Sequence, residues 1–171
     1  MPSFMSFWTK NGRLSYNLSS IDPERHTLDG VDSGLSMELA SGQLVDRYVL
    51  DSKIGEGGMA VVYKARHKTL QLPFALKFLK VTDKSIRQRL IQEGQLQASL
   101  RHANVVRVTD VLVHQGSPCL VMEYINGPSL DEWLAQNNPS NGQAEAIFMQ
   151  ILDAVQEAHE LGFIHRDLKP A

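Results

Sequence analysis

Three charged side chains in the sequence are of types that could transfer a phosphate group. Asp167 and Lys169 stand two positions apart near the C-terminal end, and Lys77 lies ninety residues before Asp167. A carboxylate can orient and deprotonate a hydroxyl, and lysines can bind phosphates as point charges. Each residue taken alone also fits an ordinary loop or strand position. The hypothesis therefore depends on the elements that would hold these side chains.

A glycine-rich stretch, whose first glycine lies 22 residues before Lys77, precedes that lysine. It consists of Ile54, Gly55, Glu56, Gly57, Gly58, Met59 and Ala60. Its glycines permit positive φ and let backbone N–H groups approach a ligand with no Cβ in the way. The β-forming residues Val61, Val62 and Tyr63 follow, so the loop is predicted to be the tip of a hairpin and not the start of a helix. Taken alone, the loop also fits a plain turn.

The glycine-rich hairpin, Lys77 and the run from His165 to Pro170 together resemble the protein kinase family. The Gly-Glu-Gly-Gly-Met-Ala pattern is most similar to the bacterial serine/threonine branch. Two positions depart from the family pattern: Ala60 replaces the usual third glycine, and Gln97 stands where an apolar residue is usual. The resemblance implies an α+β, protein-kinase-like fold, with a complete small lobe of a five-stranded antiparallel sheet plus one helix, followed by the first helices of the large lobe.

The resemblance also implies roles around the phosphates of ATP. Asp167 would orient the acceptor hydroxyl, and Lys169 would lie beside the transferring phosphate. Lys77 would bind the α and β phosphates while Glu93, on the next helix, holds its ammonium group. Glu93 alone also fits a solvated helix position. The run 100–106 favours the pairing, because it is similar to the family's Leu-x-His-Pro-Asn-Ile-Val, with alanine in place of proline.

Further residues match the family's adenine site. Val62 and Ala75 match two apolar residues placed above the adenine ring, and Met122 takes the gatekeeper position behind it. The backbone from Glu123 to Ile125 matches the hinge that hydrogen-bonds the adenine edge. With the glycine-rich loop, these residues form the predicted cofactor site for ATP.

The secondary structure predicted from pattern and caps fits this arrangement. Strands are expected near 48–54, 60–66, 73–78, 105–113 and 119–123, and a helix from 83 or 85 to about 100. Capping boxes at Ser129 to Glu132 and at Ser140 to Gln143 predict two further helices, the second ending at Leu161 with Gly162 as its stop. The wide apolar stripe of this last helix predicts neighbours on most of its sides.

Residues 1–43 are predicted to be a flexible N-terminal extension and residues 44–171 an incomplete kinase domain, with the small lobe at about 44–124 and the start of the large lobe at about 125–171. The family's ligands for Mg²⁺ would stand beyond Ala171, so no metal ligand is predicted here. The complete protein would transfer the γ-phosphate of ATP to Ser or Thr hydroxyls of proteins, with Mg²⁺ as cofactor, and this fragment alone would be inactive. The alternative is a non-catalytic nucleotide-binding or scaffold module.

The amino-acid composition limits the class of protein, its partners and its cellular location. Hydrophobic content of 43% and charged content of 21% are those of a globular protein, and no apolar run is long enough to span a membrane. The net charge of −2 gives no support to a nucleic-acid partner. A single cysteine, Cys119, excludes an internal disulfide and favours the cytoplasm, although the bacterial branch often carries a membrane anchor. Expected partners are ATP and protein substrates, and a dimer through the small lobe stays open.

Overall fold

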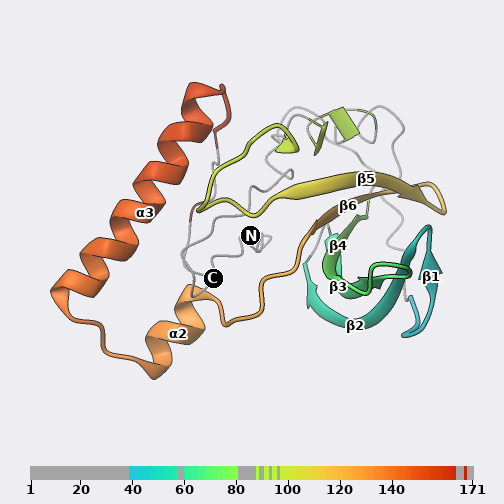
Figure 1. Cartoon of the computed structure of the whole chain (residues 1–171), viewed down its shortest axis with the longest axis horizontal. Helices are drawn as coiled ribbons and strands as arrows, with labels where there is room; N and C mark the ends of the chain where they lie inside the picture. The colour runs from blue at the N-terminus through green and yellow to red at the C-terminus, as the bar shows by residue number, and fades with distance from the viewer. Residues whose placement is uncertain are drawn as a thin grey trace, which may run out of the picture.

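The computed structural model describes residues 39–57, 60–80, 88, 91–92, 94–95, 97–164 and 168. Within them the strands are β1 Leu44–Val45, β2 Tyr48–Glu56, β3 Ala60–His67, β4 Pro73–Leu79, β5 Val108–His114 and β6 Ser117–Glu123 (Figure 1). The helices are α2 Leu130–Gln136 and α3 Asn141–Glu160. Residues 88, 91–92, 94–95 and 97 are also helical, and they fall inside the helix predicted to end near residue 100.

One antiparallel sheet contains all six described strands, in the order β1-β2-β3-β4-β6-β5. The five predicted strands are present close to their expected bounds, and β1 is the addition to the predicted five-stranded sheet. Leu44 and Val45 pair with Val49 and Tyr48 across a tight turn in which Asp46 takes a φ of 54°. Two residues are too few to show a strand period in the sequence, but the almost complete burial of Val45 holds the strand in place.

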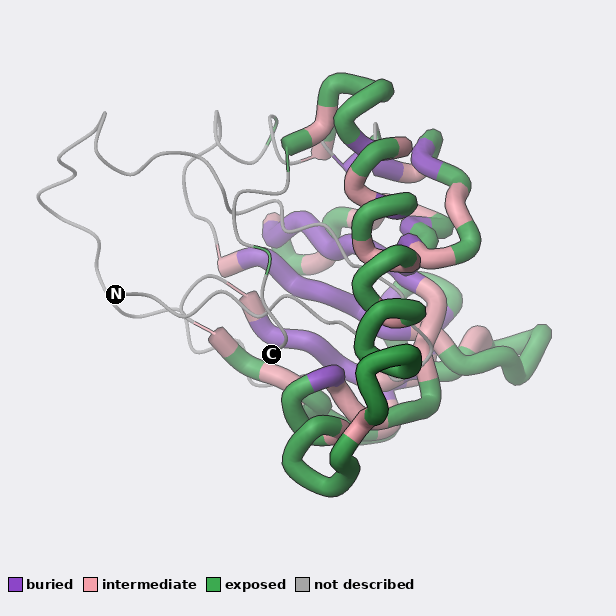
Figure 2. The backbone as a smooth tube through the Cα atoms, turned by 90° about the vertical axis from the view of Figure 1, so that its left-hand side faces the viewer, coloured by how far each residue is buried: buried purple, intermediate pink, exposed green. Residues whose placement is uncertain are grey.

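The two faces of the sheet carry separate apolar clusters, because side chains alternate along each strand. The inner cluster lies within the curl of the sheet and consists of Val45, Tyr48, Leu50, Val61, Tyr63, Ala65, Leu76, Phe78, Cys119 and Val121. The outer cluster lies on the opposite face and consists of Val62, Ala75, Leu79, Val106, Val108, Leu120 and Met122. Figure 2 shows the buried residues concentrated in the strands.

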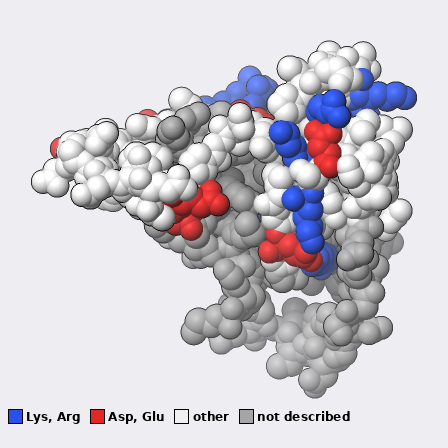
Figure 3. Space-filling view, turned by 90° about the horizontal axis from the view of Figure 1, so that it is seen from below, with Lys and Arg blue, Asp and Glu red and all other residues white. Residues whose placement is uncertain are grey.

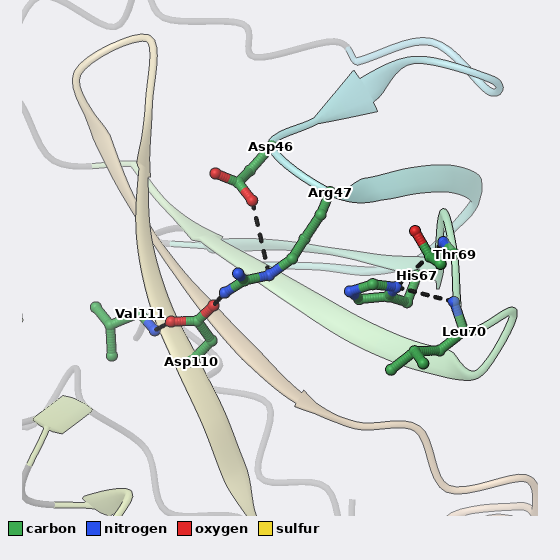
Figure 4. A network of polar contacts seen from close by, with 7 residues as sticks. All are labelled: Asp46, Arg47, His67, Thr69, Leu70, Asp110 and Val111. Atoms are coloured by element: carbon green, nitrogen blue, oxygen red, sulfur yellow. Dashed lines mark hydrogen bonds and ion pairs between the residues drawn. The ribbon is translucent and has the colours of Figure 1, made fainter.

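The sheet curls so that side chains near its two edge strands, β1 and β5, contact each other. Arg47, in the turn between β1 and β2, forms an ion pair with Asp110 of β5 (Figure 4). Gln43 Nε2 lies 3.5 Å from His114 Nε2, also on β5. The backbone N–H of Leu39 donates to the hydroxyl of Tyr63 at 3.2 Å, and the Leu39 side chain packs against the inner cluster. Contacts with the sheet therefore begin at least as early as residue 39.

The segment 100–105 joins the sheet to the helices. Leu100 and Val105 are buried in a third cluster with Leu130, Ala154 and Ala158. The side-chain amide of Asn104 donates to the backbone oxygen of Gln150 at 3.3 Å. Since 100–105 leads directly into β5, the sheet is fixed against the middle of α3.

Both predicted capping boxes are confirmed. Ser129 caps α2 with Glu132, and Ser140 caps α3 with Gln143. Gly162 has a φ of 82° just beyond α3, as expected for the predicted stop. Three members of the predicted apolar stripe, Phe148, Leu152 and Leu161, are exposed. Figure 2 shows α3 exposed along much of its length. No helix in the described ranges is long and apolar enough to cross a membrane.

Candidate functional site

Lys77 lies in β4 on the face of the sheet that carries the outer cluster. Its cross-strand neighbours are Val62 on β3 and Leu120 on β6. Only 8% of its surface is exposed. Burial lowers the pKa of Lys77 to about 8, since loss of water disfavours the charged amine. An anionic ligand at this face would stabilise the charged form and raise this pKa.

The residues predicted to contact adenine lie on the same face, with Val62 in the row of Lys77 and with Ala75 and Met122 in the neighbouring row. Ala75 of β4 pairs with Lys64 of β3 on one side and with Met122 of β6 on the other. Val62, Ala75 and Met122 all belong to the outer cluster, and Ile125 packs against it. The strand register therefore brings the predicted adenine residues next to Lys77.

The glycine-rich loop forms the tip of the hairpin between β2 and β3, as predicted. The N–H of Gly57 donates to the backbone oxygen of Ala60 at 2.8 Å and closes the tip. Gly55 pairs with Val62, which places the first glycine in the same row as Lys77. The register shifts at Ile54, and such a bulge changes the direction of a side chain. This hairpin can place its backbone amides over a ligand held by Lys77.

A close approach at Gly94 places the small-lobe helix on this face. A Cβ added at Gly94 would lie 2.6 Å from Leu120 Cδ2 and 3.3 Å from Val111 Cγ2. Because Leu120 is the cross-strand partner of Lys77, the helix crosses the sheet beside the lysine. Sequence reasoning missed Gly94. Its signal was a glycine inside a predicted helix, where glycine costs about 1 kcal/mol relative to alanine.

The predicted hinge begins where β6 ends. The Glu123 carboxylate accepts a hydrogen bond from the Arg107 N–H at 2.8 Å, and the Glu123 N–H donates to the Arg107 oxygen at 3.0 Å. Lys64 Nζ lies 4.5 Å from the ring centroid of Tyr124, a cation–π contact between β3 and the hinge. Sequence reasoning missed this pair, although strand alternation places Lys64 on the same face as Val62.

Five predicted site residues lie outside the described residues: Gly58, Met59, Glu93, Asp167 and Lys169. Their placement relative to Lys77 stays a prediction. Across the residues that the structure describes, no group of three or more His, Cys, Asp or Glu side chains could hold a metal ion.

Cys119 is a buried strand residue. Burial raises the pKa of its thiol, and the nearby charge of Asp110 raises it further. The thiolate is the reactive form of cysteine, so this environment disfavours reaction.

The amino-acid sequence of this chain matches known protein kinases. The family model described as protein kinase domain matches residues 48–171. The probable serine/threonine-protein kinase PknB of Lactococcus lactis is 38% identical over 130 residues, covering 73% of this chain and 21% of that protein. Serine/threonine-protein kinase shk1/pak1 of Schizosaccharomyces pombe is 34% identical over 117 residues, covering 68% of this chain and 18% of that protein.

A solved structure agrees with these matches. The crystal structure of the Mycobacterium tuberculosis PknI kinase domain has a TM-score of 0.68 and 28% identity, and the match covers 78% of this chain and 56% of that chain. The predicted protein-kinase-like fold is confirmed. This chain spans about a fifth of the length of the two curated relatives and a little over half of the solved domain.

Proposed function

Because the chain belongs to the serine/threonine protein kinase family, we propose that it forms the ATP-binding part of an enzyme that transfers the γ-phosphate of ATP to Ser or Thr hydroxyls of proteins. One observation carries the proposal. The row Gly55, Val62 and Lys77 and the adjacent Ala75 and Met122 share one face of the sheet. This row places the glycine-rich hairpin beside a buried amine, and the adjacent row adds apolar surface.

Residues on this face are suited to contact both the base and the phosphates of ATP. Val62, Ala75 and Met122 offer apolar contact to a flat base, and the hinge backbone beyond Glu123 supplies polar groups at its edge. Lys77 and the N–H groups of the glycine-rich loop offer positive partners to the phosphates. An anion beside this amine would stabilise its charged form, which burial disfavours.

Three residues outside the described ranges complete the proposal. Glu93 would orient the Lys77 ammonium, since it precedes Gly94, which lies against the cross-strand partner of Lys77. Asp167 would orient the acceptor hydroxyl and receive its proton, and Lys169 would lie beside the transferring phosphate. Mg²⁺ bound to ATP would neutralise phosphate charge.

Transfer itself is proposed for a polypeptide that also carries the family's metal ligands, which would follow Ala171. Residues 1–171 alone are expected to bind ATP without measurable transfer. The proposed partners are ATP and proteins with accessible Ser or Thr, and the cytoplasm is the proposed location because it contains ATP. A dimer through the small lobe remains a further proposal for the whole protein.

The test compares ATP affinity between two lysine variants, with a fluorescent ATP analogue as probe and unlabelled ATP as competitor. Lys77→Met removes the buried amine and should weaken binding at least about tenfold. Lys68→Met removes an exposed lysine in the turn after β3 and should bind like the wild type. Equal affinity of the two variants would refute the proposed site.

A further inference from the structure

Glu56 binds two lysines from inside the glycine-rich loop. Its Oε2 lies 2.7 Å from Lys53 Nζ, three residues earlier on β2. Its Oε1 lies 2.7 Å from Lys80 Nζ, just beyond the end of β4. One carboxylate therefore joins the hairpin tip both to its own strand and to the end of a strand 24 positions along the chain.

The register shows which side of the loop this ion cluster occupies. Glu56 pairs with Val61, and Val61 pairs with Phe78, so all three side chains point to the inner-cluster face. Lys77, one position before Phe78, points to the opposite face. The Glu56 carboxylate thus holds the loop from the side away from the proposed ATP site.

In this cluster one carboxylate, that of Glu56, lies between two lysines. Hydrogen bonds from Lys53 and then Lys80 lower the pKa of Glu56 to about 2, so the carboxylate is ionised at any pH used for assay. Figure 3 shows basic and acidic side chains alternating along a strip of one face, with no large patch of a single sign among the residues drawn in colour.

We propose that Glu56 is a positioning residue that fixes the height of the glycine-rich loop above Lys77 by binding Lys80; for its effect on ATP this inference rests on the proposed function. Lys80 follows Lys77 by three residues, so a loop bound to Lys80 is tied to the segment that carries the buried amine. The backbone ladder joins the β3 side of the tip to β4, with Ala60 opposite Leu79. Among the described residues the β2 side has no backbone pairing with β4, and the Glu56 to Lys80 pair connects the two directly.

The competing interpretation is that the Glu56 to Lys80 ion pair has no effect on the loop, because exposed ion pairs usually contribute little to stability. The two interpretations differ in what a mutation changes. If the pair has no effect on the loop, its loss leaves loop motion and ATP affinity unaltered. Loss of the positioning pair loosens the loop and weakens ATP binding, while the melting temperature changes little.

The experiment uses the full chain with Glu56→Gln, Lys80→Gln, the two combined, and Lys53→Gln. Asp51→Asn is the matched control, since Asp51 is another β2 carboxylate, paired with Arg66 at 3.0 Å and away from the loop. Amide hydrogen exchange across 55–62 and affinity for a fluorescent ATP analogue are measured for each variant.

Glu56→Gln and Lys80→Gln should each speed exchange in the loop and weaken ATP binding about threefold to tenfold, without adding when combined. Lys53→Gln, which removes only the partner on the same strand, and Asp51→Asn should change neither the exchange nor the affinity by more than about twofold. Unaltered loop exchange in Glu56→Gln would overturn the inference. If the wild type itself bound no ATP, the proposed function would fail, and loop exchange alone would still decide whether Glu56 holds the loop.

Discussion

His102 Nε2 lies 3.0 Å from Asp153 Oδ2, so the loop that follows the small-lobe helix is bound to the middle of α3. The Asn104 N–H donates to His102 Nδ1 at 3.2 Å, which leaves the proton of a neutral ring on Nε2, facing the carboxylate. This contact and the burial of Leu100 and Val105 connect the sheet to the helices.

We predict that His102→Ala lowers the free energy of unfolding by about 1 kcal/mol, because it removes a charge-assisted hydrogen bond at a mostly buried ring. Asp153→Asn should cost less, since its side chain is largely exposed. Urea unfolding of the two single variants and the double variant gives the coupling energy. Strict additivity would show that the two side chains do not interact in solution.

Two helical glycines should respond differently to replacement by alanine. Gly142→Ala in α3 meets open space and should stabilise the chain by about 0.4 to 1 kcal/mol. Gly94→Ala should lose this gain, and Gly94→Val should destabilise by about 1 to 3 kcal/mol, because the added atoms meet buried Leu120. Thermal unfolding measures all three. A stabilising Gly94→Val would contradict the close packing of this helix.

Stability should rise with pH through the titration of Lys77. Its folded pKa of about 8 lies below the ordinary value of 10.5, so between these pH values the unfolded chain binds more protons than the folded chain. The free energy of unfolding should therefore increase by up to about 1.4 kcal/mol per pH unit in this window. Lys77→Met should remove this slope in urea unfolding at pH 8 and 9.5, and an equal slope in both proteins would argue against a buried, deprotonating lysine.

The ion pair that closes the sheet should control motion at its edges. Asp110→Asn removes the partner of Arg47 while keeping the shape of the side chain. Amide exchange should become faster in β1 and β5 and stay unchanged in β3 and β4, which are hydrogen-bonded on both sides. Faster exchange throughout the sheet would instead indicate global destabilisation.

Local patterns in the sequence predicted much of the fold. The glycine-rich hairpin follows from glycines next to β-branched residues, and the capping boxes at Ser129 and Ser140 follow from short-range spacing. The strand period places Val62 on one side of β3. Only the pairing between strands shows that Lys77 lies directly opposite Val62 and that Ala75 lies in the next row.

The features that were missed depend on residues far apart in the chain. Arg47 and Asp110 are 63 positions apart, and neither lies in a pattern that signals pairing. Gly94 packs on Leu120 across the helix–sheet interface, which no helical period reveals. The roles of Glu93, Asp167 and Lys169 rest on family motifs alone.

Labelling with an acyl-phosphate derivative of ATP tests the central claim most directly, because it transfers its acyl group to a lysine beside the bound phosphates. Peptide mass spectrometry then identifies the modified lysine. The account predicts acylation of Lys77, made easier by its pKa of about 8 and suppressed by excess unlabelled ATP. Acylation confined to exposed lysines such as Lys68, or labelling of Lys77 that ATP does not suppress, would contradict an ATP site on this face.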